Sequence, residues 1–232
     1  MPDKGLYERL NSELGRIHDQ VRDLKVNQYV FWEVQDIISK NDNLRKPSTF
    51  YGWMGSMYAS SMSASVRRLV DQRRDALSLV RLLEEVKANL SLFSREEYRN
   101  RCTNPNVPAD YTDGDYDKLV GKGNRLPDPA AIAMDISSLK EKTEILKKFV
   151  DENIAHTKLE ERKDQDIPKF QDLDDAIEFV EQLVKRYLHL FRGVGMSTLL
   201  PTWTYDWKEI FRYPWIEVRD QPMPPENRTA RS

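Results

Sequence analysis

His156 is one of three histidines in the 232-residue chain, and its neighbours are residue types that suit proton transfer. Glu152 lies four residues before it, Asn153 three before and Glu160 four after, so on a continuous helix these side chains share or border one face. An imidazole can act as a general acid or base near neutral pH, and the two carboxylates favour its protonated form. The amide of Asn153 can orient a ligand by hydrogen bonding. The spacing therefore predicts a catalytic group of His156, Asn153 and Glu152.

Other catalytic chemistries lack their residue patterns in this sequence. Glu152 and His156 have one residue too many between them for the Glu-x-x-His step of di-iron bundles, and the pair occurs once. Cys102 is the single cysteine, and no histidine stands at a zinc-ligand spacing from it. The Gly-x-Ser-x-Gly elbow of serine hydrolases is absent. Gly121-Lys-Gly123 matches neither the P-loop nor the glycine-rich dinucleotide-binding fingerprint. We therefore expect no metal and no cofactor.

The spacing of apolar residues predicts the helices that position this group. Apolar side chains recur every three or four residues from Tyr7 to Leu24 and from Ile177 to Phe191, which is typical of amphipathic helices. Gly193 is suited to end the second of these helices. The first stripe can serve an internal core or a partner helix, and we favour the core because that is the more frequent use of such a face.

Capping residues predict where the other helices begin. Pro47 and Ser48 suit the first turn of a helix, Asp75 and Ser94 are each expected to cap one, and Asp128 is expected to cap the helix that runs to His156. The helix after Ser48 is rich in glycine and serine, for which close approach by another backbone is a physical reason. Its methionine and aromatic residues, including Trp53 and Met57, are expected in the core.

These elements predict an all-α fold, a helical bundle of about five long helices. Prolines, glycines and acidic residues between about 102 and 128 predict a long irregular loop. Aromatic residues from Trp203 to Trp215, interleaved with Lys208 and Arg212, predict an apolar strap over the bundle, although such rings can also stack on single-stranded nucleic acid. Residues 1–216 are expected to form one domain, and residues 217–232 a disordered tail.

Composition limits the surroundings in which the chain works. The 36 Lys and Arg residues nearly balance the 38 Asp and Glu residues, so no overall field attracts nucleic acid or anionic lipid. One cysteine excludes an intrachain disulfide, and neither a signal-peptide core nor a run of about 20 apolar residues is present. We expect a cytoplasmic protein that makes no use of a membrane.

Several passages together resemble the abortive-infection U branch of the HEPN-domain proteins. The order of the helices agrees, and the resemblance covers most of the chain. The passages that carry it are Arg67-Arg-Leu69 with Asp71, Asp75-Ala-Leu-Ser-Leu79, Asn153-Ile-Ala-His156 and Phe211-Arg-Tyr-Pro-Trp215. The resemblance implies a helical domain that dimerises, in which the active helices of two subunits line one cleft. It also implies an RNA substrate, a role in phage defence and a partner such as a nucleotidyltransferase antitoxin or another defence-system protein.

This sequence departs from the family's catalytic motif, in which an arginine precedes the histidine by four to six intervening residues. The corresponding positions are Phe149, Val150 and Asp151, and none of them is basic. Cleavage of RNA without a metal needs a cation for the charge that builds on phosphorus, which a carboxylate cannot supply. Two hypotheses follow: a degenerate metal-independent ribonuclease that takes its cation from elsewhere, such as Arg73, Arg74 or Arg101, or a non-catalytic dimer that binds a protein or a nucleic acid.

Overall fold

The described part of the chain is built from helices joined by short connections. The computed structural model describes residues 3–102, 109–153 and 168–215, and these ranges contain no strand. The helices are α1 (Lys4–Lys40), α2 (Thr49–Leu69), α3 (Leu79–Ala88), η1 (Leu90–Phe93), α4 (Arg95–Cys102), α5 (Ala109–Val120), α6 (Pro129–Asn153), α7 (Phe170–Arg192) and η3 (Glu209–Arg212). The predicted all-α helical bundle is confirmed.

The apolar stripe of α1 lies in the core of the bundle. Leu10, Leu14, Ile17 and Val21 are fully buried, which confirms the core interpretation of this stripe over a partner helix. Burying one such side chain stabilises the fold by about 1.5 to 3 kcal/mol. The predicted face of α7 is buried as well, and Gly193 ends α7 with a φ of 65°.

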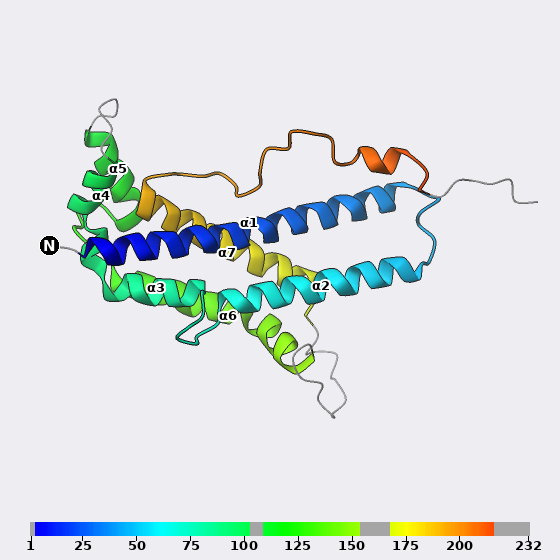
Figure 1. Ribbon diagram of the computed structural model, residues 1–232, viewed down its shortest axis with the longest axis horizontal. Helices are drawn as coiled ribbons and strands as arrows, with labels where there is room; N and C mark the ends of the chain where they lie inside the picture. Colours follow the sequence, from blue (N-terminus) through cyan, green and yellow to red (C-terminus); the bar gives the residue numbers. More distant parts are fainter. Residues whose placement is uncertain (1–2, 103–108, 154–167, 216–232) are drawn as a thin grey trace, which may run out of the picture. The chain divides into compact units, whose positions relative to one another are not determined.

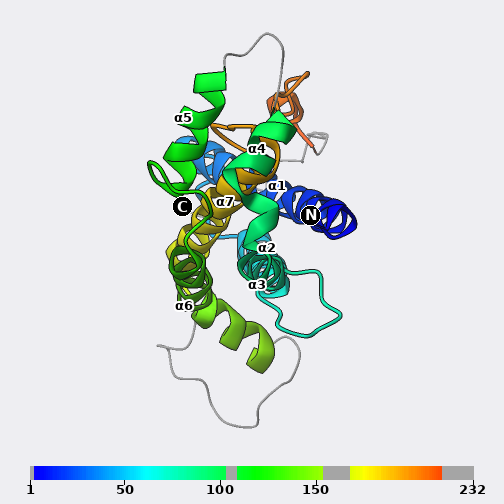
Figure 2. The same ribbon diagram turned by 90° about the vertical axis from the view of Figure 1, so that its left-hand side faces the viewer.

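In residues 1–200 the long helices run beside one another, as Figures 1 and 2 show. α1 packs along α7, and α7 packs against α6. α2 turns back beside α1 and makes extensive contact with α6, and α3 also lies against α6. α4 and α5 pack together and against α7, near the end of the bundle where α1 begins. This packing brings the last turns of α2 and α6 together.

Most of the predicted capping residues lie directly before a helix in the structure. Ser48 caps α2, Ser94 accepts a hydrogen bond from the third residue of α4, and Asp128 accepts one from the second residue of α6. The predicted cap at Asp75 is wrong, because Ser78 caps α3 by accepting a hydrogen bond from the backbone N–H of Arg81 at 3.2 Å. Residues 71–77 form a connecting loop instead of a first turn.

The irregular loop predicted for residues 102–128 contains a helix, α5, so that part of the prediction is wrong. The physical reason is tertiary packing. Tyr116 is fully buried, its ring lies 5.3 Å from that of Tyr98, and its hydroxyl donates to the carbonyl oxygen of Phe93 at 2.8 Å. Burial of a whole tyrosine outweighs the weak helix propensity of Gly114 and the acidic residues around it.

The glycine-rich half of α2 differs from its prediction. A Cβ added to Gly52 would meet no atom within 4 Å, and at Gly55 it would meet a ring atom of Phe170 at 3.6 Å, so no other backbone approaches closely. Trp53 and Met57 were expected in the core, but they are 58% and 53% exposed.

The described residues from Pro201 to Trp215 belong to a second unit of the chain. Within this unit the rings of Trp203, Trp207, Phe211 and Trp215 form a series, with centroids 6.2, 6.3 and 5.7 Å apart. The aromatic residues therefore pack on one another. Their role as a strap over the bundle stays a prediction, as does the single domain of residues 1–216.

Candidate functional site

The candidate site lies at the carboxyl end of α6. Glu152 is half-buried in the last turn, and Asn153 is the last helical residue. His156 lies outside the described residues, so the structure leaves the predicted meeting of the three side chains untested. What the structure does describe is the surroundings of the turn that should contain the arginine of the family motif.

An arginine from another helix reaches this turn. The Nε atom of Arg67, near the end of α2, donates a hydrogen bond to a carboxylate oxygen of Asp151 at 3.0 Å. Asp151 is one of the three positions at which the motif arginine is missing. The close packing of α2 on α6 makes this contact across 84 residues of sequence. A guanidinium group is thus present beside the motif turn although the motif itself has none.

A second carboxylate holds the same guanidinium from the α2–α3 loop. Nη1 of Arg67 donates to Asp71 at 2.7 Å, and the backbone N–H of Arg73 donates to the other oxygen of Asp71 at 3.0 Å. Burial opposes ionisation of Asp71, but the hydrogen bonds from the Arg73 backbone and from Arg67 outweigh it and lower the pKa of this carboxyl group. Asp71 therefore stays ionised and fixes the direction of the Arg67 side chain.

Arg67 keeps its charge, and one edge of its guanidinium makes no hydrogen bond to the residues that the structure describes. The hydrogen bond to Asp151 raises the pKa of Arg67 against the opposing effect of burial, so the guanidinium stays cationic. Within the described part of the chain, Nη2 makes no hydrogen bond, and 29% of the side chain is exposed. The Nη2 edge can donate to an anion, although the two carboxylates nearby reduce the local positive potential.

From the sequence, Arg73, Arg74 or Arg101 could supply the cation. The structure places each of these arginines in different surroundings. Arg73 pairs with Asp71 at 3.2 Å. Arg74 lines a pocket on the α1 side of the same loop. Arg101 lies with its guanidinium carbon 4.5 Å from the ring centre of Tyr7 and donates to a backbone carbonyl oxygen, which is a structural role.

Arg67 itself was missed as a cation, although its passage was among those that carried the resemblance. The available local signal was Asp71 four residues later, a spacing typical of an ion pair at a helix end. That spacing predicts a paired arginine but says nothing about α6.

Within the described ranges, no group of three histidine, cysteine or acidic residues is placed to hold a metal ion. None of the helices described has both the length and the apolar character needed to cross a bilayer.

Comparison with protein-family models gives a match over most of the chain. The family model HEPN_AbiU2, described as AbiU2, matches residues 4–212, which is most of the chain. No curated protein and no solved structure matches. The matched range includes α2, α6 and the contact between Arg67 and Asp151. The chain therefore belongs to the HEPN AbiU2 family.

Proposed function

We propose that this chain is a defence protein of the HEPN type that acts on RNA at the carboxyl end of α6, with Arg67 as the cation that the motif lacks. Membership of the AbiU2 family supports the defence role. The observation that carries the assignment of the site is the 3.0 Å hydrogen bond from Arg67 to Asp151, at a position where the family motif has arginine.

The chemistry needs three groups. Cleavage forms a bond between the ribose 2′-oxygen and phosphorus and breaks the bond between phosphorus and the 5′-oxygen. A base takes the 2′-hydroxyl proton, an acid protonates the departing 5′-oxygen, and a cation stabilises the charge on the phosphoryl oxygens. His156 is proposed for one proton transfer and Arg67 for the cation, with Asp151 as the residue that positions Arg67.

The position of His156 in the sequence is compatible with its acting together with Arg67 on one substrate. His156 lies three positions after Asn153, so covalent geometry keeps its Cα within about 11 Å of the end of α6. Asn153 and Glu152 are proposed to orient the substrate and the imidazole. We further propose that the active form is a cytoplasmic homodimer, and that an antitoxin or another defence-system protein controls it.

A second candidate function is a non-catalytic dimer that binds a protein or a nucleic acid as a scaffold or regulator. The observation that favours it is the double pairing of Arg67. Asp151 and Asp71 occupy two donor positions of its guanidinium, which in an ordinary nuclease would face the phosphate. In this case Arg67 would stabilise the packing of α2 on α6 and would have no catalytic role.

Incubation of the purified full-length protein with labelled RNA in EDTA separates the two functions. The ribonuclease proposal expects cleavage without metal, and it expects His156→Ala to abolish that cleavage. Cleavage that persists in the His156→Ala variant would remove this imidazole from the mechanism. Binding of RNA without any cleavage by the wild type would favour the scaffold.

A further inference from the structure

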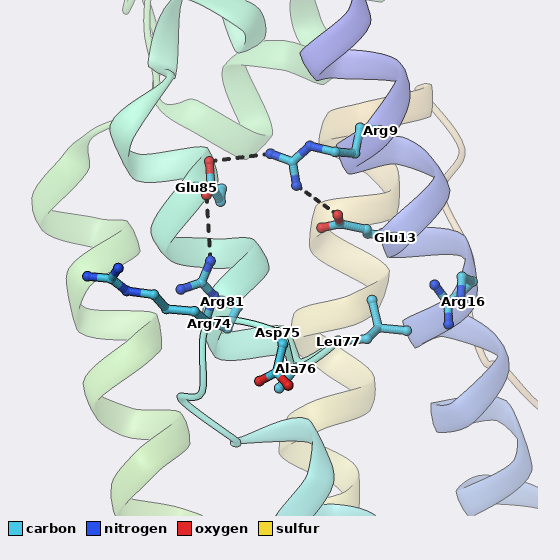
Figure 3. A pocket seen from close by; sticks show the side chains of 9 residues that line it. All are labelled: Arg9, Glu13, Arg16, Arg74, Asp75, Ala76, Leu77, Arg81 and Glu85. Carbon is cyan, nitrogen blue, oxygen red and sulfur yellow. Dashed lines mark hydrogen bonds and ion pairs between the residues drawn. The ribbon is translucent and has the colours of Figure 1, made fainter.

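A second basic site lies between α1, the α2–α3 loop and the first turns of α3 (Figure 3). It is a pocket with a volume of about 180 Å³. Its walls carry four arginines: Arg9 and Arg16 on α1, Arg74 on the loop and Arg81 on α3. None of these residues belongs to the cluster of Arg67, Asp71 and Asp151. The site therefore needs its own explanation.

Two of the acidic residues in the pocket are occupied by ion pairs. Arg9 contacts Glu13 at 2.8 Å and Glu85 at 3.7 Å, and Arg81 contacts Glu85 at 3.8 Å (Figure 3). The two contacts to Glu85 are long, and exposed pairs of this kind contribute about 1 kcal/mol or less. An incoming anion can therefore compete for Arg9 and Arg81 at little cost in free energy.

The other two arginines have no acidic partner within the described part of the chain. Arg16 extends from α1 on one side of the pocket, and Arg74 extends from the loop past Arg81 (Figure 3). Asp75 also lines the pocket without an ion pair there, and its carboxylate opposes an anion. Over the whole lining, four arginines stand against three acidic residues, Glu13, Asp75 and Glu85, and this excess of positive charge favours a negatively charged ligand.

The frame of the pocket is fixed before any ligand arrives. Asp71 holds the beginning of the loop through the backbone N–H of Arg73. At the other end the hydroxyl of Ser78 donates to the carbonyl oxygen of Asp71 and caps α3. The positive end of the α3 dipole consequently lies beside the arginines. A site prepared in this way loses little conformational entropy on binding.

The size of the pocket selects the ligand. Pockets for drug-sized molecules measure about 300 Å³ or more, so this one suits a compact anion or one group of a larger molecule. Guanidinium forks match the oxygens of a phosphate group in pairs. We propose that this pocket binds a phosphate group, which belongs either to an RNA strand or to a free nucleotide. This site goes beyond the proposed catalytic site and does not depend on cleavage.

Arg16→Gln is the sharpest variant for a test, because Arg16 makes no ion pair that the change would break in the described structure. Arg22→Gln is the matched control, since it removes the same charge from the same helix outside the pocket. Binding to the full-length protein is measured with two probes, a single-stranded oligoribonucleotide and adenosine triphosphate. Asp75→Asn completes the set, because it removes the opposing charge.

For the probe that occupies the pocket, Arg16→Gln should weaken binding about tenfold, Asp75→Asn should strengthen it, and Arg22→Gln should change it little. If the probe is RNA, the salt dependence of log K should also lose about 0.7 in slope for one lost contact. If it is the nucleotide, RNA affinity should stay unchanged in Arg16→Gln.

Three results would overturn the proposal: no binding of either probe to the wild type, equal losses in Arg16→Gln and Arg22→Gln, or an unchanged affinity in Asp75→Asn. Failure here is distinguishable from failure at α6. An Arg16→Gln protein that binds both probes as tightly as the wild type does, and that cleaves RNA normally, contradicts the pocket and leaves the α6 proposal standing. A wild-type protein that cleaves no RNA, but whose probe binding depends on Arg16, contradicts the α6 proposal and leaves the pocket proposal standing.

Discussion

Among the residues of the candidate site, Arg67 from a neighbouring helix lies beside the turn whose motif positions lack an arginine. Asp151 stands at a motif position where arginine is expected, and the guanidinium of Arg67 binds it at 3.0 Å. The carboxylate thus brings a cation to the turn that lacks one. Nη2 of Arg67 makes no hydrogen bond to a described residue, and it is the group that we expect to contact phosphate.

The stability of this cluster depends on Asp71. Asp71→Asn removes a charge that accepts hydrogen bonds from Arg67 and from the Arg73 backbone, and we expect a loss of about 2 kcal/mol in the free energy of unfolding at pH 7. The pKa of Asp71 is lower in the folded chain than its ordinary value of 3.8, so this contribution is complete above that value. It disappears as the pH falls through the folded pKa.

Urea unfolding of the wild type and of Asp71→Asn at pH 7 and at pH 3 measures this contribution. The difference between the two proteins should be smaller at pH 3. A difference that stays constant, or one that grows in acid, would show that the charge of Asp71 does not stabilise the cluster.

At the scale of elements, the sequence predicts those helices whose signals are local. The apolar stripes of α1 and α7 and the caps Ser48, Ser94 and Asp128 are all local, and the structure has helices at each of them. α5 could not be predicted in this way. Its glycine and acidic residues indicate a loop, and the burial of Tyr116 that overrides them depends on α4 and η1.

Gly193, which ends α7, allows a direct test. Its φ is 65°, and a Cβ added there would lie 2.5 Å from the sulfur of Cys102. Gly193→Ala should therefore lower the free energy of unfolding by about 2 kcal/mol, because the left-handed conformation and the clash both oppose a side chain.

Gly52→Ala is the matched control for this substitution. Gly52 lies within α2, and a Cβ there meets nothing within 4 Å, so alanine should stabilise the protein by about 0.5 to 1 kcal/mol. Urea midpoints of both variants provide the comparison. Equal midpoints for Gly193→Ala and the wild type would mean that the end of α7 is not constrained as described.

In the whole molecule, the candidate site depends on contacts between distant helices, which a single sequence does not predict. The absence of a basic residue at positions 149–151 can be read directly from the chain. The contact between Arg67 and Asp151 cannot, because it depends on how α2 packs against α6 across 84 residues. The pocket beside α3 likewise combines α1 with a loop about 60 residues later.

Assembly also belongs to this scale. We expect a homodimer, so light scattering at micromolar concentration should give twice the 27.3 kDa of the chain. Dilution of the sample through the nanomolar range should then reveal the dissociation constant. A species with the mass of one chain at every concentration would contradict the shared cleft that the resemblance implies.

If Arg67 supplies the cation at the end of α6, RNA cleavage in EDTA should depend on its guanidinium. Arg67→Gln should lose at least about a hundredfold in kcat/KM, and Arg67→Lys should recover part of it, since a lysine keeps the charge without the planar fork. Thermal unfolding of each variant checks that the fold is retained.

Arg68→Gln is the control, because Arg68 neighbours Arg67 on α2 and its hydrogen bond goes to Ser65. Asp151→Asn should lower kcat more than it raises KM, as expected when Arg67 keeps its charge and loses its position. Cleavage should fall in Arg67→Gln and survive in Arg68→Gln. Cleavage that is equal in folded Arg67→Gln and wild-type protein would contradict the proposed role of Arg67.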